Sequence, residues 1–446
     1  MSLLRTLAAL LWLSLGSSMA FAVTNAQLFA WAGATFPSIF NGPLVAGQVA
    51  QFDYRYFTGS GNAVAVDTSG TVFVLGPLTG NTLVPVSTLP ALADTINTWQ
   101  AAQPVGAAIQ MGGARQGVAL MAGTPAGTVA TLAGTGNSSF ADGIGGGASF
   151  HFPSGVTTDG ANLYIADTDN NRIRRVVIAT GAVSTLAGSG YPASVDGTGT
   201  AAMFYGPTGI TTDGTCLYVT DHSSALVRKV VIATGGVTTL AGSGANSSTD
   251  GTGLAATFGG PLGITTDGVN LYVVDNATAK IRKIVLATAV VTTLAGTGKA
   301  GAADGAGTAA SFAQPNGITT DGTSLYIVDS GNNKVRKLVI ASGLVSTLAG
   351  SGSAGAVDGA AAASFNTPAG ITSDGTYLYV GDSGNQKVRK IAIATGAVST
   401  LAGSGAAGTA DGSAVVATFK YPDSLTTDGI TLFVVDRVGN KLRKIQ

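Results

Sequence analysis

The chain has 446 residues, and its 23 Lys and Arg balance 23 acidic residues, every one of which is Asp. Gly accounts for 65 residues and Glu is absent, a composition that disfavours helices because Gly costs roughly 1 kcal/mol at an interior helical site. A chain with zero net charge lacks the excess of basic residues that is typical of nucleic-acid-binding proteins. The single Cys excludes an intrachain disulfide framework and a Cys-based zinc cluster.

Residues 1–22 have the pattern of a secretory signal peptide. Met1–Arg5 carries one positive charge, Leu7–Leu15 is a short apolar run, and Ala20-Phe21-Ala22 supplies a small-x-small cleavage pattern. A buried N-terminal helix is the alternative interpretation. No other run approaches the ~18 apolar residues of a membrane span. We therefore expect an exported protein, periplasmic or extracellular, without a membrane span.

Residues 23–102 predict a small α+β module, and residues 103–126, rich in Gly, Ala and Pro, predict a linker. The module is expected to contain two helices and a three-stranded meander, namely helices Ala26–Phe40 and Leu92–Ala101 and strands Phe52–Phe57, Ala63–Asp67 and Thr71–Leu75. The segments Ala26–Ala32 and Tyr54–Asn62 resemble a small module that recurs in exported proteobacterial proteins.

Residues 127–446 consist of a unit of about 54 residues that repeats six times. Each unit shares a Thr-Leu-Ala-Gly motif, a Phe-x-x-Pro motif, an Asp-Gly pair, an aromatic residue three positions before a second Asp, and an aliphatic-Arg-basic triplet. The Thr-Leu-Ala-Gly motif begins at Thr131, Thr185, Thr239, Thr293, Thr347 and Thr400, and the triplet Arg is Arg174, Arg228, Arg282, Arg336, Arg389 or Arg443.

Each unit predicts four short antiparallel strands, which is the signature of a propeller blade. In the second unit the strands are expected at Gly209–Thr212, Cys216–Thr220, Leu226–Ala233 and Val237–Ala241, with Asp-Gly and Thr-Gly turns between them. The array begins with a lone fourth strand and stops after a third strand. Closure of the ring would join these parts into one blade and leave no exposed edge. The predicted fold class is therefore all-β: a six-bladed β-propeller closed by an N-terminal fourth strand, preceded by the small α+β domain.

The repeat also carries a family resemblance. The run from Phe312 to Lys337, with the trailing Val345–Gly350, resembles the NHL repeat in the long form common in exported bacterial proteins. The resemblance covers some 320 residues and implies the propeller fold. It does not fix a function, because such propellers serve as protein-, ligand- and RNA-binding scaffolds and, less often, as lyases.

Most Asp residues occupy positions that recur in every blade. Three six-fold columns hold 18 of the 23: a loop Asp, a turn Asp in Asp-Gly, and an Asp that ends the second strand. A residue needed once per blade indicates a structural role, as a turn hydrogen bond or an Asp–Lys/Arg pair, rather than a ligand. Strand three holds 17 of the 23 basic residues, which we expect to form a solvated stripe around the ring.

A localised function is expected where the copies differ. The two residues inside Phe-x-x-Pro vary, blade six has Asp423 and Arg437 where other blades have neither, and blade two has a His in its turn. Blades six, one and two are neighbours in a closed ring. The candidate ligand-binding residues are His151, Tyr205, His222, Lys420, Tyr421, Asp423 and Arg437, and the alternative is drift at exposed loop positions.

The sequence favours an exported, non-catalytic recognition scaffold that binds a protein or a glycan through the loop face of the propeller. The alternative is a metal-dependent six-bladed enzyme of lyase or lactonase type with a site at the channel mouth. Members of those types use a Glu or several His, whereas this chain has no Glu and two His. We expect no catalytic residues, no metal ligands, no cofactor, no nucleic-acid partner, and a monomer.

Overall fold

The computed structural model describes the backbone at 64–66, 72–74, 110–111 and 118–119, and all of residues 127–446. The chain divides into two compact units, 1–124 and 125–446. In the first unit, β1 (Val64–Val66) pairs antiparallel with β2 (Val72–Val74), and β3 (Gln110–Met111) pairs with β4 (Val118–Ala119). The predicted signal peptide, both helices and the strand Phe52–Phe57 lie outside the described residues, so the N-terminal module stays a prediction.

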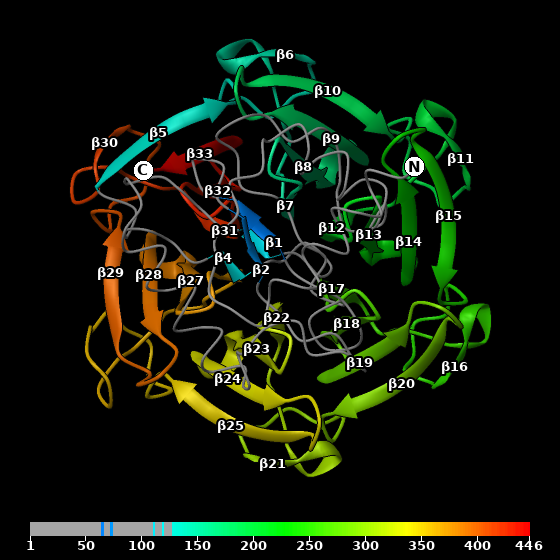
Figure 1. The fold of residues 1–446 in the computed structure, drawn as a ribbon, viewed down its shortest axis with the longest axis vertical. Coiled ribbons are helices and arrows are strands. Elements are labelled where there is room, and N and C mark those ends of the chain that lie inside the picture. Colours follow the sequence, from blue (N-terminus) through cyan, green and yellow to red (C-terminus); the bar gives the residue numbers. More distant parts are fainter. Residues whose placement is uncertain (1–63, 67–71, 75–109, 112–117, 120–126) are drawn as a thin grey trace. The chain divides into compact units, whose positions relative to one another are not determined.

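The second unit is a six-bladed β-propeller, as predicted, with six antiparallel sheets arranged around a central axis (Figure 1). The innermost strands are β7 (Val156–Thr158), β12 (Pro207–Thr212), β17 (Pro261–Thr266), β22 (Pro315–Thr320), β26 (Ile371–Ser373) and β31 (Pro422–Thr427). The second strands are β8 (Asn162–Asp167), β13 (Cys216–Asp221), β18 (Asn270–Asp275), β23 (Ser324–Asp329), β27 (Tyr377–Asp382) and β32 (Leu432–Asp436). The third are β9 (Arg172–Val177), β14 (Leu226–Val231), β19 (Lys280–Val285), β24 (Lys334–Val339), β28 (Lys387–Ala392) and β33 (Lys441–Ile445). The fourth are β10 (Ala182–Ala187), β15 (Gly236–Ala241), β20 (Val290–Ala295), β25 (Leu344–Ala349), β29 (Val398–Ala402) and β5 (Thr128–Ala133).

The long loop that precedes each blade contains elements that the sequence did not predict. In five blades this loop adds a two-residue fifth strand outside the fourth, namely β6 (Gly143–Ile144), β11 (Gly197–Thr198), β16 (Gly251–Thr252), β21 (Gly305–Ala306) and β30 (Gly412–Ser413). Four of these loops also hold a 3-10 turn, η1 (Gly145–Gly147), η3 (Gly199–Ala201), η5 (Gly253–Ala255) and η6 (Gly307–Ala309). Four more lie between strands two and three, η2 (Thr168–Asn170), η4 (His222–Ser224), η7 (Ser330–Asn332) and η8 (Ser383–Asn385).

The ring closes by pairing the start of the propeller with its end. The fourth strand of blade six is β5, which pairs antiparallel with β33 and places Thr131 opposite Arg443. The predicted closure by an N-terminal fourth strand is confirmed. Because the two strands come from opposite ends of the repeat array, no blade is left with an unpaired fourth strand position.

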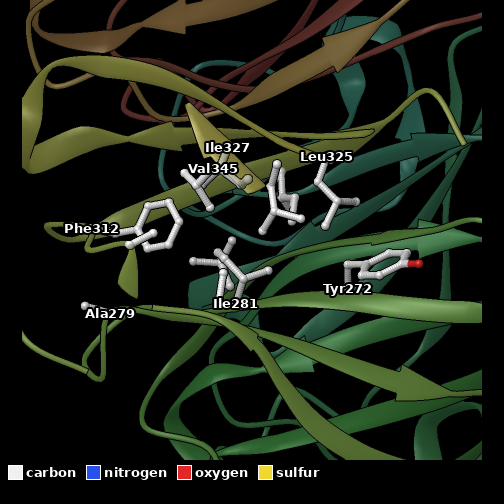
Figure 2. Packing of buried hydrophobic residues seen from close by; sticks show 12 residues of the cluster. Tyr272, Ala279, Ile281, Phe312, Leu325, Ile327 and Val345 are labelled. Atoms are coloured by element: carbon white, nitrogen blue, oxygen red, sulfur yellow. The ribbon is translucent and has the colours of Figure 1, made fainter. Parts of the chain in front are cut away.

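The core lies between neighbouring blades rather than within one. Each second strand is buried on both faces, which explains why these strands read as continuous apolar runs rather than alternating ones. Between blades three and four, for example, Ile281 packs in one cluster with Phe312, Leu325 and Ile327, all at most 1% exposed (Figure 2). The Phe of each Phe-x-x-Pro motif therefore belongs to an inter-blade core.

The Thr-Leu-Ala-Gly motif needs its Gly for a close backbone approach. The strand-four ladder is interrupted between Thr185 and Ala187, so the chain bends away from its partner. Gly188 then has φ +103°, and a Cβ there would lie 2.5 Å from the Asn171 carbonyl oxygen. A side chain at this position would meet both strain and a clash.

The turn Asp of each blade closes the hairpin between strands one and two. In blade four, Asp321 accepts the backbone N–H groups of Thr323 and Ser324 at 2.8 and 2.7 Å and the Tyr326 hydroxyl at 2.8 Å. Burial raises the pKa of Asp321, but these hydrogen bonds outweigh it and hold that pKa below its usual value. This column is structural, in agreement with the sequence-based interpretation.

The prediction of a solvated basic stripe is wrong for the six triplet arginines. Each triplet Arg is 0% exposed and bridges two carboxylates of its own blade. In blade three, Arg282 Nη1 lies 3.2 Å from Asp275 Oδ2 and Nη2 lies 2.8 Å from Asp250 Oδ1, while the guanidinium sits 5.3 Å from the centroid of the Phe258 ring. The guanidinium fork satisfies two carboxylates at once, which lets it be buried where a lysine would leave one acceptor unpaired.

Candidate functional site

A pocket of about 480 Å³ lies on the loop face, where the innermost strands begin around the axis. All six blades contribute to it. The residue after the Phe-x-x-Pro proline, or the residue that follows it, lines the pocket in every blade, at Ser154, Thr208, Leu262, Asn316, Gly370 and Asp423. The remaining lining comes mainly from blades six, one and two, so the pocket extends toward one sector of the ring.

A ring of glycines sets how closely the innermost strands approach one another. A Cβ on Gly263 would lie 2.3 Å from the Asn316 carbonyl oxygen of the next blade, and the equivalent glycines of blades one, two, four and five meet the next blade in the same way, at Gly155, Gly209, Gly317 and Gly370. Blade six has Ser424 instead, and its Oγ accepts the Val156 backbone N–H of blade one at 3.3 Å. The ring of glycines around the axis is therefore interrupted at the junction of blades six and one.

Five of the seven sequence-predicted site residues line this pocket: His151, Tyr205, His222, Asp423 and Arg437. They come from blades one, two and six, the sector expected from the sequence. Lys420 and Tyr421 are not among the lining residues. The ligand-binding role of all seven stays a prediction.

His151 and Tyr205 are held by their backbones and leave their side chains available. The N–H of each donates to the Asp that ends strand two of its blade, at 2.8 Å to Asp167 and 2.7 Å to Asp221. The His151 side chain is 35% exposed, and its Nε2 lies 3.7 Å from Asp169 Oδ2. Tyr205 is 48% exposed. The carboxylate columns thus position variable side chains at the pocket without lining it themselves.

His222 has a structural contact as well as a place in the pocket lining. It begins η4, and its Nδ1 lies 3.3 Å from the Pro261 carbonyl oxygen of blade three. In the same position of blade three, Asn276 donates to the Pro315 carbonyl oxygen at 2.7 Å. His222 is therefore one member of a column that joins five of the six blades to the next.

Asp423 and Arg437 form a pair inside the pocket. Arg437 Nη1 lies 3.5 Å from Asp423 Oδ2, the Asp423 side chain is 10% exposed, and the Arg437 side chain is 36% exposed. Burial raises the pKa of Asp423 above its usual value, and the Arg437 charge only partly offsets that rise. Burial, followed by the Asp423 charge, also raises the pKa of the neighbouring Tyr421.

The backbones of Lys420 and Tyr421 are engaged in building the blade. The Lys420 N–H donates to Asp436 Oδ1 at 2.6 Å, and the Tyr421 N–H donates to Gln386 Oε1 of blade five at 2.7 Å. Tyr421 has φ +69°, a left-handed conformation that is costly for a bulky residue. The corresponding residue also has positive φ in the other five blades, at Phe152, Gly206, Gly260, Gln314 and Thr367. The strained position is therefore a feature of the repeat.

The sequence did not identify several lining residues in the turns between strands two and three. Thr168, Asp169 and Asn171 of blade one and Ser223 of blade two line the pocket. The available signal was their position directly after the Asp that ends strand two, since that turn lies on the same face as the start of strand one. Differences between the copies indicated only His222 and Arg437 in this turn.

The described residues contain no group of three or more His, Cys, Asp or Glu side chains placed to hold one metal ion. The column carboxylates are occupied by arginine, backbone and hydroxyl donors instead. The described part of the chain also contains no helix with the length and apolar character of a membrane span.

No protein-family model matches the chain. NHL repeat-containing protein 2 from Homo sapiens is 27% identical over 300 residues, which cover 58% of this chain and 41% of that protein. The chain spans less than half the length of the curated relatives that it matches. The chain is a six-bladed β-propeller that is similar in sequence to NHL repeat-containing proteins.

Solved bacterial structures share the fold of this six-bladed propeller. A structural genomics protein of unknown function from Bacteroides thetaiotaomicron aligns with a TM-score of 0.56 and 22% identity, over 72% of this chain and 75% of that chain. An auxiliary nutrient binding protein from the same organism aligns with a TM-score of 0.55 and 18% identity, over 72% and 76% of the two chains. At these identities the likeness shows the fold.

Proposed function

We propose that this six-bladed propeller is an exported, non-catalytic binding protein whose axial pocket holds the end of a glycan. The observation that carries the proposal is the pocket of about 480 Å³, formed where the repeat columns give way to residues that differ between blades. Small-molecule sites usually occupy about 300–1,000 Å³. The export step rests on the signal-peptide pattern of residues 1–22, which lie outside the described residues.

The chemistry of the lining favours a polyhydroxylated ligand. Hydroxyl groups of Ser154, Thr208 and Ser223 and the amide of Asn316 offer both donors and acceptors. Tyr205 adds a half-exposed aromatic ring, which can cover the apolar face of a sugar while its hydroxyl stays in water.

The shape of the site favours a glycan end over a protein surface. Stable protein interfaces bury about 1,200–2,000 Å² in total and are generally broad, whereas this site is one concave pocket at the axis. The name of the Bacteroides thetaiotaomicron neighbour, auxiliary nutrient binding protein, supports a binding role. For the metal-dependent enzyme, the alternative expected from the sequence, the described residues offer no cluster of ligands.

A glycan array probed with the full-length protein tests the proposal. We expect retention of a defined set of glycans, with at least a tenfold loss of affinity in Tyr205→Ala. Tyr191→Ala is the matched control, because Tyr191 is also an exposed tyrosine, at 69%, and does not line the pocket. The proposal fails if no glycan is retained above background, or if the two variants behave alike.

A further inference from the structure

Blade six departs from a column of inter-blade contacts. The residue after the Asp that ends strand two contacts the proline carbonyl oxygen of the next blade in the other five blades. These contacts are Thr168 to Pro207 at 2.8 Å, His222 to Pro261 at 3.3 Å, Asn276 to Pro315 at 2.7 Å, Ser330 to Pro368 at 2.5 Å and Ser383 to Pro422 at 2.6 Å. In blade six this residue is Arg437, which is directed to Asp423 of its own blade instead.

Asp423 is itself an exception in a second column. The other blades have a neutral residue directly after the Phe-x-x-Pro proline: Ser154, Thr208, Leu262, Asn316 or Ala369. The Asp423 residue is 7% exposed, and among the described residues its carboxylate has one ion-pair partner, the guanidinium of Arg437, 3.5 Å away, and no closer hydrogen-bond donor. By contrast, the column carboxylate of Asp321 accepts four hydrogen bonds shorter than 3 Å. A buried carboxylate with open acceptor positions is costly unless something else supplies donors.

Arg437 has spare hydrogen-bonding capacity at the same place. Within the described residues its ion-pair contact is the long one to Asp423, and its side chain is 36% exposed. Both side chains line the axial pocket. The pair therefore places a carboxylate and a guanidinium side by side in the lining of the pocket.

We infer that Asp423 and Arg437 together hold a neutral group with an adjacent donor and acceptor, the vicinal hydroxyls of an uncharged sugar residue at the glycan end. This inference rests on the proposed function and adds the class of sugar. One hydroxyl donates to the carboxylate and its neighbour accepts from the guanidinium, both as charge-assisted hydrogen bonds. A uronate carboxylate would be repelled by Asp423, and the ammonium of an amino sugar would be repelled by Arg437.

The experiment uses the full-length protein on an array of matched oligosaccharides ending in neutral, uronate or free amino sugars. We expect the wild type to retain neutral ends at least tenfold better than uronate or amino ends. The double variant Asp423→Ser/Arg437→Ser, which installs residues found in other blades, should lose neutral binding at least tenfold while its Tm stays near that of the wild type. Lys444→Ser, a loss of charge in the same blade outside the pocket, should bind as the wild type does.

A single variant keeps the test decisive if the double variant does not fold. Asp423→Asn preserves the side-chain shape and removes the charge that repels acidic sugars, so its preference should shift toward uronate ends. Preference of the wild type for a charged end, or unchanged neutral binding in these variants, overturns the inference. Loss of binding in Tyr205→Ala alone would then leave the proposed function standing, whereas absence of any retained glycan removes both.

Discussion

The backbone N–H of Thr131 donates to Asp411 Oδ2 at 3.0 Å across 280 residues of sequence. The same carboxylate lies 2.7 Å from Arg443 Nη2, so one Asp joins the N-terminal strand β5 to the C-terminal strand β33. Within blade three, Asp250 joins Thr293 to Arg282 through the same contacts. The ring is thus closed by the same contacts that hold strands three and four together inside a blade.

Replacing Thr131 by Pro should destabilise the closed ring. The substitution removes the N–H that Asp411 accepts, in a strand that no hairpin turn joins to its partner, and we expect a loss of about 2 kcal/mol or more. Thr131→Val keeps that N–H and loses only the hydroxyl contact, so it should cost about 1 kcal/mol. Urea unfolding of the two variants measures the difference, and equal losses would contradict this account of closure.

Removing one triplet arginine should be among the most damaging substitutions in the propeller. Arg282→Met leaves Asp275, which is 0% exposed, without its cation, and breaking such a buried pair typically costs about 3–5 kcal/mol. The neighbouring Lys283→Met is the control, since Lys283 lies outside this network and should change stability by less than about 0.5 kcal/mol. Chemical denaturation of both proteins at the same pH makes the comparison. A tolerated Arg282→Met would show that the buried pairs are dispensable.

The contribution of Asp436 to the free energy of unfolding should become more favourable as the pH falls. Burial raises its pKa to about 6 from 3.8, so the folded state binds more protons than the unfolded state between these values. The charged form therefore costs stability above pH 6, and this cost, on the order of 2 kcal/mol, is relieved as the pH falls from 7 to 4. Unfolding free energies of wild type and Asp436→Asn at both pH values isolate the effect. The unfolding free energy of the wild type, relative to that of Asp436→Asn, should be higher at pH 4 than at pH 7. A lower relative value at pH 4 would contradict the raised pKa of Asp436.

A methyl group on the axial glycine ring should be poorly tolerated. Gly263→Ala places a Cβ 2.3 Å from the Asn316 carbonyl oxygen, and forcing the two blades apart should cost about 1–3 kcal/mol. Gly146→Ala is the matched control, because nothing lies within 4 Å of a Cβ there and its φ is not positive. Thermal unfolding of the two variants checks this, and indistinguishable Tm values would mean that the axis is less tightly packed than the structure shows.

The fold was largely predictable because the residues that each strand and turn requires recur at equivalent positions in six copies. Predicted strand Cys216–Thr220 and observed strand β13 differ by one residue, and the closure by β5 follows from the order of motifs. The burial of Arg282 was not predictable from its strand, since a basic residue in an alternating pattern normally faces solvent. It depends on Asp250, which is 32 residues away in sequence and reaches the guanidinium only after the long loop folds back over the blade.

The candidate site was only partly predictable, for a different physical reason. Variation between copies identified Tyr205 and Asp423 as departures from the columns, and both line the pocket. Variation alone did not separate Asp423 from Lys420, although they are three residues apart. The direction of each side chain depends on the strained turn at Tyr421 and the start of β31, which the three-dimensional backbone determines.

A crystal structure of the full-length protein with a glycan retained on the array tests the central claim most directly. The account predicts that an uncharged terminal sugar occupies the axial pocket, with adjacent hydroxyls on Asp423 and Arg437 and the ring of Tyr205 against one face. Density for the glycan on the opposite face of the propeller, or on the outer loops with the axial pocket empty, would contradict it.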